Sequence, residues 1–438
     1  MRFELQNQNG MSQSAAAQVR RLRTYVRRDV LSGVLRRWSW RGRRRVAHDV
    51  RRAELRAKRA LGTNVGVGAF GVHAQVPAHA LLLGEENSLP AVDVARIIGA
   101  LLYPSTPLPE WPMVVAARDT ADEAARERLQ QIGLTHIATV GHYFGCRTTR
   151  DIDALVESLR DATGPIRVRR VHASDCFLVV SGHTAAARAA LRGEQTIDVI
   201  VERTRTWTPL QEMLRAMSWL GGRVELYQPI DAPEVANESW PIVRQCTDRF
   251  ALMHEFLVER KLLPPAVRTF MDVGASYGWF VAQMQRLGFD ASGMDLDPLA
   301  RELAAGVFGI RPEQYTVGDS AEELLRCTPT DVVSCFSVAR HFALGRGSVS
   351  VDEFRDRLAK ATRRVLFFDT GEAHEAWIGR NLPEWTPEYI AKWLEAAGFD
   401  EVVALGIDRD DKAPYEGNYG RTLFACVRND ANATTSDR

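Results

Sequence analysis

Two aspartates and two glycines between residues 270 and 297 have the types and spacing of a nucleotide site. Asp272 lies in an apolar run at 269–273, and a turn containing Gly274 and Gly278 follows it. A helical pattern and a second predicted strand at 290–294 then lead to Asp295. Strand, glycine turn, helix, strand and acid form the layout of a nucleotide-binding βαβ unit. We therefore predict that the glycines allow close backbone approach to a ligand and that Asp295 binds a ribose diol.

The phosphates of a dinucleotide do not suit this turn. A pyrophosphate usually requires G-x-G-x-x-G before a helix N-terminus, whereas this chain has D-x-G-x-x-x-G, and Asp272 would repel an anion. The carboxylate suits a ligand that carries an ammonium and a sulfonium. With DVGASYG followed by DLDP, the chain resembles the class I S-adenosylmethionine-dependent methyltransferases. Ser276 stands at the place of that family's middle glycine.

The resemblance covers residues 263–428 and implies an α/β fold with a Rossmann-like, seven-stranded methyltransferase sheet that binds S-adenosylmethionine. Further strands are expected at 314–317, 331–336, 365–369, 401–407 and 421–428, the last two antiparallel, with a helix at 386–397. In the family an acid after the third strand binds the adenine amino group, a role that falls to Asp319. The cofactor-binding residues that the resemblance implies are Asp272, Gly274, Ser276, Gly278, Asp295, Asp319, Ser320 and Phe336.

Acid–base chemistry would come from residues that follow the fourth and fifth strands. Methyl transfer from a sulfonium is an in-line displacement that depends on positioning, and a hydroxyl acceptor also benefits from a base with a pKa near neutral. His341 follows the fourth strand, and Glu372 and His374 follow the fifth. We predict these three as candidates for base or acceptor contact, with packing as the alternative for each. No metal site is expected, because the six cysteines form no C-x-x-C pair.

Residues 111–205 predict a smaller α/β domain, with strands at 113–116, 137–140, 166–171, 177–180 and 197–201 and helices at 120–132, 152–159 and 183–191. The segment FLVVSGHTAAARAALRGEQTIDVIV is similar to the ParB/sulfiredoxin-like domain, in which a Gly-His-x-Arg turn holds nucleotide phosphates. Ser181 replaces the usual acid and Ala185 the arginine, and Arg188 lies one helical turn further on. A structural or recognition role is therefore favoured over nucleotide hydrolysis, and His183 is expected to be a turn or cap residue.

Residues 206–262 predict a helical connector or cap, with helices at 210–220 and 243–258. In small-molecule methyltransferases such a segment often covers the cofactor, so Tyr227, Arg244 and Arg249 are candidates for the border of the site. A packed connector is the simpler alternative. The segment 61–110 is expected to be irregular apart from a helix at 91–102, and residues 429–438 are expected to be a disordered tail.

Positive charge is concentrated near the N-terminus of this 438-residue chain. The net charge is only +1, yet residues 20–59 hold 16 Arg and Lys against 3 acids, which leaves the remainder at −12. Residues 1–60 are therefore predicted to be a basic, partly disordered arm. The arm is either solvated, bound to an anionic membrane surface through Trp38 and Trp40, or bound to nucleic acid. Scattered cysteines and the absence of a signal peptide favour the cytoplasm, with the inner face of the membrane as a further location.

The preferred function is S-adenosylmethionine-dependent O-methylation of a small molecule, glycan or glycolipid, with cell-surface polysaccharide assembly as the setting. DNA methylation is disfavoured, because residues 337–341 contain neither an N/D-P-P-Y/F loop nor a Pro-Cys nucleophile. A competing hypothesis is a nucleic-acid-binding, ParB-like regulator whose methyltransferase domain only binds ligand. A nucleic-acid or protein methyltransferase is a further alternative. The sequence leaves the acceptor and the oligomeric state open.

Overall fold

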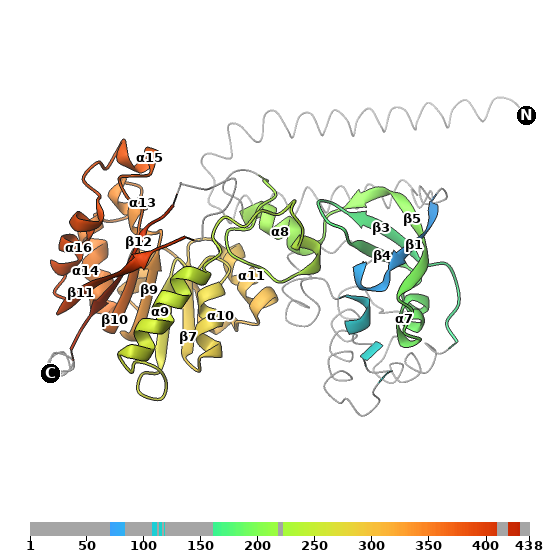
Figure 1. Ribbon diagram of the computed structural model, residues 1–438, viewed down its shortest axis with the longest axis horizontal. Helices are drawn as coiled ribbons and strands as arrows, with labels where there is room; N and C mark the ends of the chain where they lie inside the picture. The colour runs from blue at the N-terminus through green and yellow to red at the C-terminus, as the bar shows by residue number, and fades with distance from the viewer. Residues whose placement is uncertain are drawn as a thin grey trace, which may run out of the picture. The chain divides into compact units, whose positions relative to one another are not determined.

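The computed structural model describes residues 71–83, 107–111, 114–115, 118, 161–217, 222–409 and 419–429, and this part of the chain forms two β-sheets (Figure 1). Within the described residues, every helix is too short or too polar to cross a membrane. The predictions for the basic arm, the helices at 91–102, 120–132 and 152–159, the strand at 137–140 and the residues beyond 429 lie outside the described residues.

The seven-stranded sheet has the order β11-β12-β10-β9-β6-β7-β8. The five strands β6 to β10 all pair in parallel with one another, while β12 is antiparallel to both β10 and β11. The predicted seven strands are therefore present, with the antiparallel pair at the C-terminal end of the chain. The strands are β6 (Thr269–Val273), β7 (Asp290–Asp295), β8 (Tyr315–Val317), β9 (Thr330–Phe336), β10 (Thr362–Asp369), β11 (Glu401–Ile407) and β12 (Thr422–Val427).

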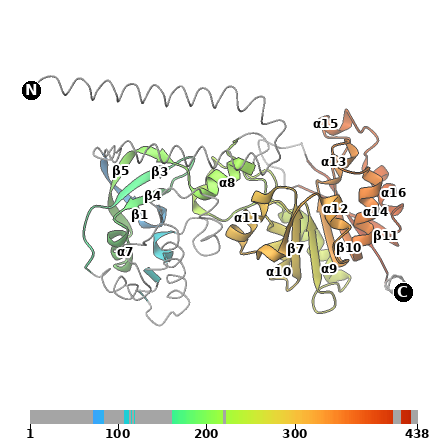
Figure 2. The ribbon, with the colours of Figure 1, turned by 180° about the vertical axis from the view of Figure 1, so that it is seen from behind.

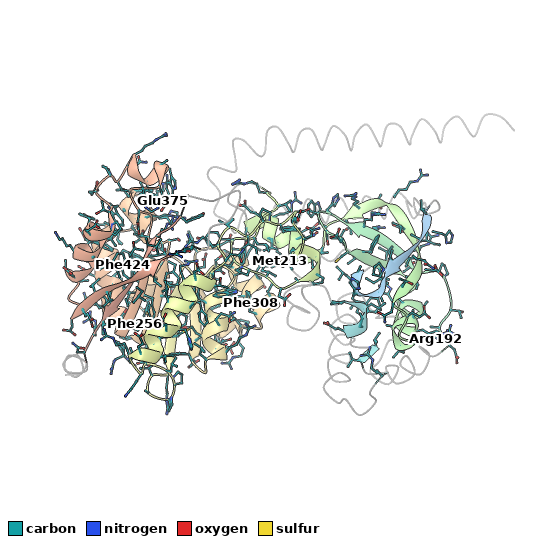
Figure 3. All side chains as sticks on the ribbon, viewed as in Figure 1. Arg192, Met213, Phe256, Phe308, Glu375 and Phe424 are labelled. Atoms are coloured by element: carbon teal, nitrogen blue, oxygen red, sulfur yellow. The ribbon has the colours of Figure 1, made fainter. Side chains whose placement is uncertain are left out.

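Helices cover both faces of this sheet (Figures 1 and 2). One face packs on α9 (Thr247–Glu259), α10 (Trp279–Arg286) and α11 (Pro298–Phe308). The other face packs on α12 (Ser320–Leu324), α13 (Ala339–Ala343), α14 (Val351–Ala361) and α16 (Pro387–Glu395), with α15 (Ala376–Gly379) and η5 (Pro312–Gln314) in the connections. Phe256 of α9 lies in the first layer and Phe424 of β12 faces the second (Figure 3). Central strands buried on both faces explain the near-continuous apolar runs in the sequence.

Local signals fix where the helices of this domain begin. Asp297 accepts a hydrogen bond from the backbone N–H of Leu299, and Pro298 follows it as the first residue of α11. Ser350 caps α14 and Thr386 caps α16 in the same way. The predicted helix at 386–397 is thus found as α16, with Thr386 as its cap.

The smaller sheet has five strands in the order β1-β5-β3-β4-β2: β1 (Val72–Pro77), β2 (Leu81–Leu82), β3 (Arg167–Val171), β4 (Phe177–Ser181) and β5 (Thr196–Thr206). Its helix α7 (His183–Leu191) packs three buried alanines on the sheet. Strands β3 and β4 and the helix lie where the sequence predicted them, whereas β5 continues past the predicted end at 201 to Thr206. Short 3-10 turns η2 (Ala78–Ala80) and η3 (Leu108–Glu110) complete the described part.

Two predictions for this region are wrong. Residues 72–77 were expected to be irregular, but they form β1, which pairs antiparallel with β5 over six residues. The sequence hides this strand because its partner is more than a hundred positions away. A strand was expected at 113–116, but Val114 and Val115 are helical, and their N–H groups both donate to the carbonyl of Trp111. Tertiary context here overrides the β-propensity of valine.

The connector contains α8 (Pro209–Met217), η4 (Pro233–Val235) and α9. The helix predicted at 243–258 starts later than expected, because the N–H groups of Val243 and Arg244 donate to the carbonyls of Leu226 and Tyr227 instead of joining a helix. Cys246, with a φ of 70°, then turns the chain into α9.

Candidate functional site

The turn between β6 and α10 depends on glycine at two positions. Gly274 and Gly278 have φ angles of 82° and 86°, which favour glycine. A Cβ on Gly274 would lie 2.3 Å from Cγ2 of Val338, so a side chain there would collide with the segment after β9. Ser276 also has a positive φ, 51°, which costs about 1–2 kcal/mol for a non-glycine residue. Its N–H donates to Oδ2 of Asp295 at 3.0 Å, which helps to hold the turn.

Asp295 stands at the carboxyl end of β7, next to this turn. Its Oδ1 accepts a hydrogen bond from the N–H of Asp297 at 2.9 Å, and burial raises the pKa of the carboxyl. A carboxylate has about four acceptor positions, so the backbone fixes its orientation and leaves capacity for a ligand's hydroxyl groups. The neighbouring side chain of Leu296 is 71% exposed, which provides an apolar surface beside the acid.

Asp319 follows β8 at the same edge of the sheet. Its Oδ1 caps α12 by accepting from the N–H of Ala321 at 2.9 Å, and it also accepts from Oγ of Ser348 at 3.0 Å. Ser320 is the first residue of α12. Capping therefore uses Oδ1 of Asp319, and Oδ2 is the oxygen that a ligand amino group would meet.

Asp272 is fully buried within β6, and only one of its carboxyl oxygens has a partner. Oδ1 accepts from Oγ of Ser334 at 2.7 Å, whereas Oδ2 has no hydrogen-bond partner among the described residues. Burial raises the pKa of Asp272 to about 7, although the hydrogen bond from Ser334 and the charge of Arg249 oppose the rise. An orphaned buried carboxyl oxygen is costly, and a cationic ligand group would satisfy it. Ser334, in β9, was not predicted, because only strand pairing brings it beside Asp272.

The N-terminus of α10 is occupied by a side chain of the connector. Oε1 of Gln228 accepts hydrogen bonds from the N–H of Tyr277 at 3.1 Å and of Trp279 at 3.4 Å. The hydroxyl of Tyr277 in turn accepts from the N–H of Tyr227 at 3.2 Å. These are the helix N–H groups that bind pyrophosphate in dinucleotide-binding folds. A neutral amide oxygen therefore takes the place where a phosphate would bind.

Replacing Gln228 by alanine should destabilise the protein by about 1–3 kcal/mol, because two buried N–H groups lose their acceptor. Urea unfolding followed by tryptophan fluorescence measures this change. Gln283, on the same helix, provides a matched control, since its side chain accepts a hydrogen bond from the exposed side chain of Arg286. Equal stability of the Gln228→Ala and Gln283→Ala variants would contradict the capping role.

A buried cluster of ions lies at the carboxyl end of β10. Asp369 accepts from Nη1 of Arg249 at 2.9 Å and from the N–H of Ser337 at 2.8 Å, and Nη2 of Arg244 lies 3.7 Å from its Oδ2. Burial alone would raise the pKa of Asp369, but the guanidinium groups of Arg249, Arg244 and Arg421 bring it below its ordinary value. Arg244 also pairs with Asp408, which follows β11.

The two connector arginines thus lie at the edge of the sheet that holds the predicted site. Arg249 additionally places its guanidinium 5.0 Å from the ring of Phe336, one of the predicted cofactor residues. The ring of Phe336 in turn lies 4.8 Å from that of Phe280. Asp369, Asp408 and Arg421 were not predicted, since no local pattern distinguishes them from surface charges.

His341 lies in α13, after β9, with an exposed ring. Crowding by the surrounding protein, together with the charges of Arg340, Arg346 and Arg421, lowers the pKa of His341 to about 4. The imidazole is therefore neutral at pH 7 and able to accept a proton, although a base with so low a pKa is a weak one.

Glu372 and His374 form a pair after β10. Nδ1 of His374 lies 3.3 Å from Oε2 of Glu372, and Nε2 lies 2.5 Å from the carbonyl oxygen of Tyr419. Since a carbonyl only accepts, Nε2 carries a proton, and the contact with Glu372 is attractive only when Nδ1 or the carboxyl is protonated as well. Burial raises the pKa of Glu372, in keeping with a shared proton.

In the smaller domain, the turn compared with the Gly-His-x-Arg motif is tightly packed. Gly182 has a φ of 80°, and a Cβ there would lie 2.5 Å from the carbonyl oxygen of Pro165. His183 starts α7, with its ring 5.9 Å from that of Trp111. Nη1 of Arg188 donates to the carbonyl of Ala162 at 2.8 Å, so one donor of its guanidinium is already used by the backbone.

Comparison with solved structures finds methyltransferase folds. The bifunctional kinase-methyltransferase WbdD shares 18% identity over 50% of this chain and 46% of its own, with a TM-score of 0.40. The magnesium protoporphyrin IX methyltransferase ChlM from Synechocystis PCC 6803, solved with bound SAM, shares 17% identity over 42% of this chain and 80% of its own (TM-score 0.32). A SAM-dependent methyltransferase from Archaeoglobus fulgidus shares 15% identity over 40% of this chain and 92% of its own (TM-score 0.29).

No protein-family model and no curated protein matches the chain. The chain spans less than half the length of WbdD. At these identities the similarity concerns the fold alone, so the function has to be inferred from the geometry of the site.

Proposed function

We propose that residues 263–428 bind S-adenosylmethionine and transfer its methyl group to an oxygen of a small molecule or glycan. The observation that carries this proposal is the occupation of the α10 N-terminus by Oε1 of Gln228. A nucleotide that needs phosphate binding there would have to displace a buried cap. A nucleoside without phosphates would not.

The side chains around the turn fit the groups of S-adenosylmethionine. Oδ2 of Asp272 is a buried acceptor suited to the amino-acid ammonium. The carboxylate of Asp295 suits the ribose diol, and Leu296 offers an exposed apolar surface for one face of the adenine. Oδ2 of Asp319 suits the adenine amino group. When bound, the sulfonium supplies an activated methyl group, and the protein contributes chiefly orientation.

An oxygen acceptor is consistent with the residues that follow β9 and β10. His341 is neutral at pH 7, because crowding by the surrounding protein and the charges of the nearby arginines lower its pKa to about 4. Although it is a weak base, its neutral imidazole can accept the proton that a hydroxyl group loses on methylation. We assign this role to His341 in preference to Glu372 and His374, because these two contact each other and His374 also contacts the carbonyl of Tyr419.

Calorimetric titration of S-adenosylmethionine and S-adenosylhomocysteine into the full chain tests the proposal. Both should bind, and Asp295→Ala should weaken both by about ten- to a hundredfold, because hydrogen bonds to a charged group contribute about 1.5–3 kcal/mol. Asp290→Ala is the matched control, since Asp290 is an exposed residue at the opposite end of the same strand. Absence of binding to the intact wild type, or equal binding by both variants, would refute the proposed function.

A further inference from the structure

Two fully buried arginines share one aromatic cover at the carboxyl edge of the seven-stranded sheet. Arg244 comes from the connector and Arg421 immediately precedes β12, and both side chains are 0% exposed. The ring of Tyr419 lies 4.3 Å from the guanidinium carbon of Arg244 and 4.9 Å from that of Arg421. A single ring therefore separates two cations from whatever lies beyond it.

The two arginines differ in how well the protein satisfies them. Arg421 forms a two-pronged pair with Glu375, at 2.7 Å and 2.9 Å, and donates to Oγ of Ser337 at 2.7 Å. Arg244 pairs through Nη2 only, and its Nε and Nη1 have no hydrogen-bond acceptor among the described residues. Burial and the charge of Arg249 lower the pKa of Arg244 to about 10, which reflects this incomplete compensation. The cluster retains donors for one further anion.

Arg244 and Arg421 lie near the residues proposed to contact the methyl acceptor, rather than near those proposed to bind the nucleoside. Ser337, which Arg421 contacts, directly follows β9, and Arg421 is among the charges that lower the pKa of His341. Ligands of open α/β sheets bind at this edge. Arg340, whose guanidinium lies 5.4 Å from the ring of Trp377, adds a further cation to the same part of the sheet.

We propose that Arg244 and Arg421 form a subsite for an anionic group of the methyl acceptor, a phosphate monoester or a carboxylate, and that the ring of Tyr419 leaves them when this group binds. The inference rests on the proposed methyltransferase function and narrows its substrate class. Arginine is suited to both anions because its planar donors match their oxygen geometry. Without the anion, the ring of Tyr419 stabilises the two guanidinium groups through its cation–π contacts.

The test uses inorganic phosphate and acetate as probes, with calorimetric titration into the full chain in a buffer free of other oxyanions. In Tyr419→Ala the affinity for at least one probe should rise about tenfold or more, because two desolvated cation–π contacts no longer compete. Tyr389→Ala, at a tyrosine that is 42% exposed in α16, should leave the affinity unchanged. If the affinity rises for phosphate alone, the group is a phosphate monoester; if it rises for acetate alone, the group is a carboxylate.

A second substitution shows whether the arginine is the ligand. Tyr419→Ala/Arg244→Gln should lose the added affinity, whereas Tyr419→Ala/Arg260→Gln should keep it. Arg260 is 41% exposed on its side chain and pairs with Glu401 at the start of β11, whereas Arg244 pairs with Asp408 beyond its end. No gain in Tyr419→Ala, or a gain that survives Arg244→Gln, would overturn the subsite.

Titration of S-adenosylmethionine into Tyr419→Ala separates this proposal from the proposed function. Cofactor binding without a gain in anion affinity overturns the subsite and leaves the methyltransferase assignment intact. A gain in anion affinity without any cofactor binding overturns the assignment of the substrate class as a methyl acceptor.

Discussion

Replacing Asp369 by alanine is expected to lower the free energy of unfolding by about 3–5 kcal/mol, the cost of removing one partner from a buried ion pair. Asp369 is 0% exposed and lies within 4 Å of three guanidinium groups, those of Arg244, Arg249 and Arg421. Without Asp369, these three buried guanidinium groups would repel one another with one fewer carboxylate to compensate their charge. The loss should therefore exceed that of an ordinary surface substitution several-fold.

Urea unfolding at pH 7 measures this change, with Asp356→Ala as the control. Asp356 also pairs with an arginine, at 2.8 Å, but its side chain is 52% exposed, and exposed pairs contribute about 0.2–1 kcal/mol. Similar losses in the two variants would show that the buried cluster does not stabilise the fold.

Acid should reproduce part of the effect of Asp369→Ala. The pKa of Asp369 is lowered in the folded state by the three arginines, so its contribution is fully present above the unfolded pKa of 3.8 and is lost as the pH falls through the lower folded value. The variant should therefore lose less stability than the wild type when the pH falls below about 4.

The second large effect concerns cofactor affinity and pH. Asp272 has a pKa of about 7 in the unliganded protein, and an ammonium would bind its ionised form. Affinity for S-adenosylmethionine should therefore rise with pH, by up to about tenfold per unit below pH 7, and level off above pH 8. Asp272→Asn keeps the shape and removes the titration, so its affinity should be lower by about ten- to a hundredfold at pH 8 and nearly independent of pH.

The sign is opposite for the stability of the unliganded protein. The folded-state pKa of Asp272 lies above the unfolded value of 3.8, so its protonated form stabilises the fold below pH 4, and that stabilisation is lost as the pH rises through about 7. The affinity for S-adenosylmethionine is measured by calorimetric titration between pH 6 and 9, in buffers matched for ionic strength. If the affinity of the wild type does not change with pH, or if Asp272→Asn shows the same pH dependence of affinity as the wild type, Asp272 does not bind the cation.

The seven-stranded domain could be predicted closely because its signals are local. The apolar run that forms β6 is short, and Gly274, Asp297 and Thr386 mark turns and helix starts by their own chemistry. Seven strands followed from the resemblance together with these local signals. The same reasoning failed for β1, whose pairing with β5 joins segments that are far apart in sequence.

The candidate site was predictable only as far as backbone geometry determines it. The glycines and Asp295 follow from the strand–turn–helix pattern. Gln228, Ser334 and Asp408 do not, because each acts on a residue at least forty-nine positions away and has no distinctive neighbours. His341, Glu372 and His374 were recognised by position, but their neighbouring charges, which decide how readily they accept a proton, depend on the tertiary fold.

The amide of Gln228 has a consequence for how this domain can be exchanged between proteins. Between Leu226 and Arg249 the connector supplies the cap of α10 and two of the cations that neutralise Asp369. A chimera that grafts a foreign N-terminal module at residue 263 would separate the sheet from these groups, leaving bare N–H donors at one point and uncompensated carboxylates at another. The unit that can be exchanged between proteins as a whole is therefore expected to begin before Leu226.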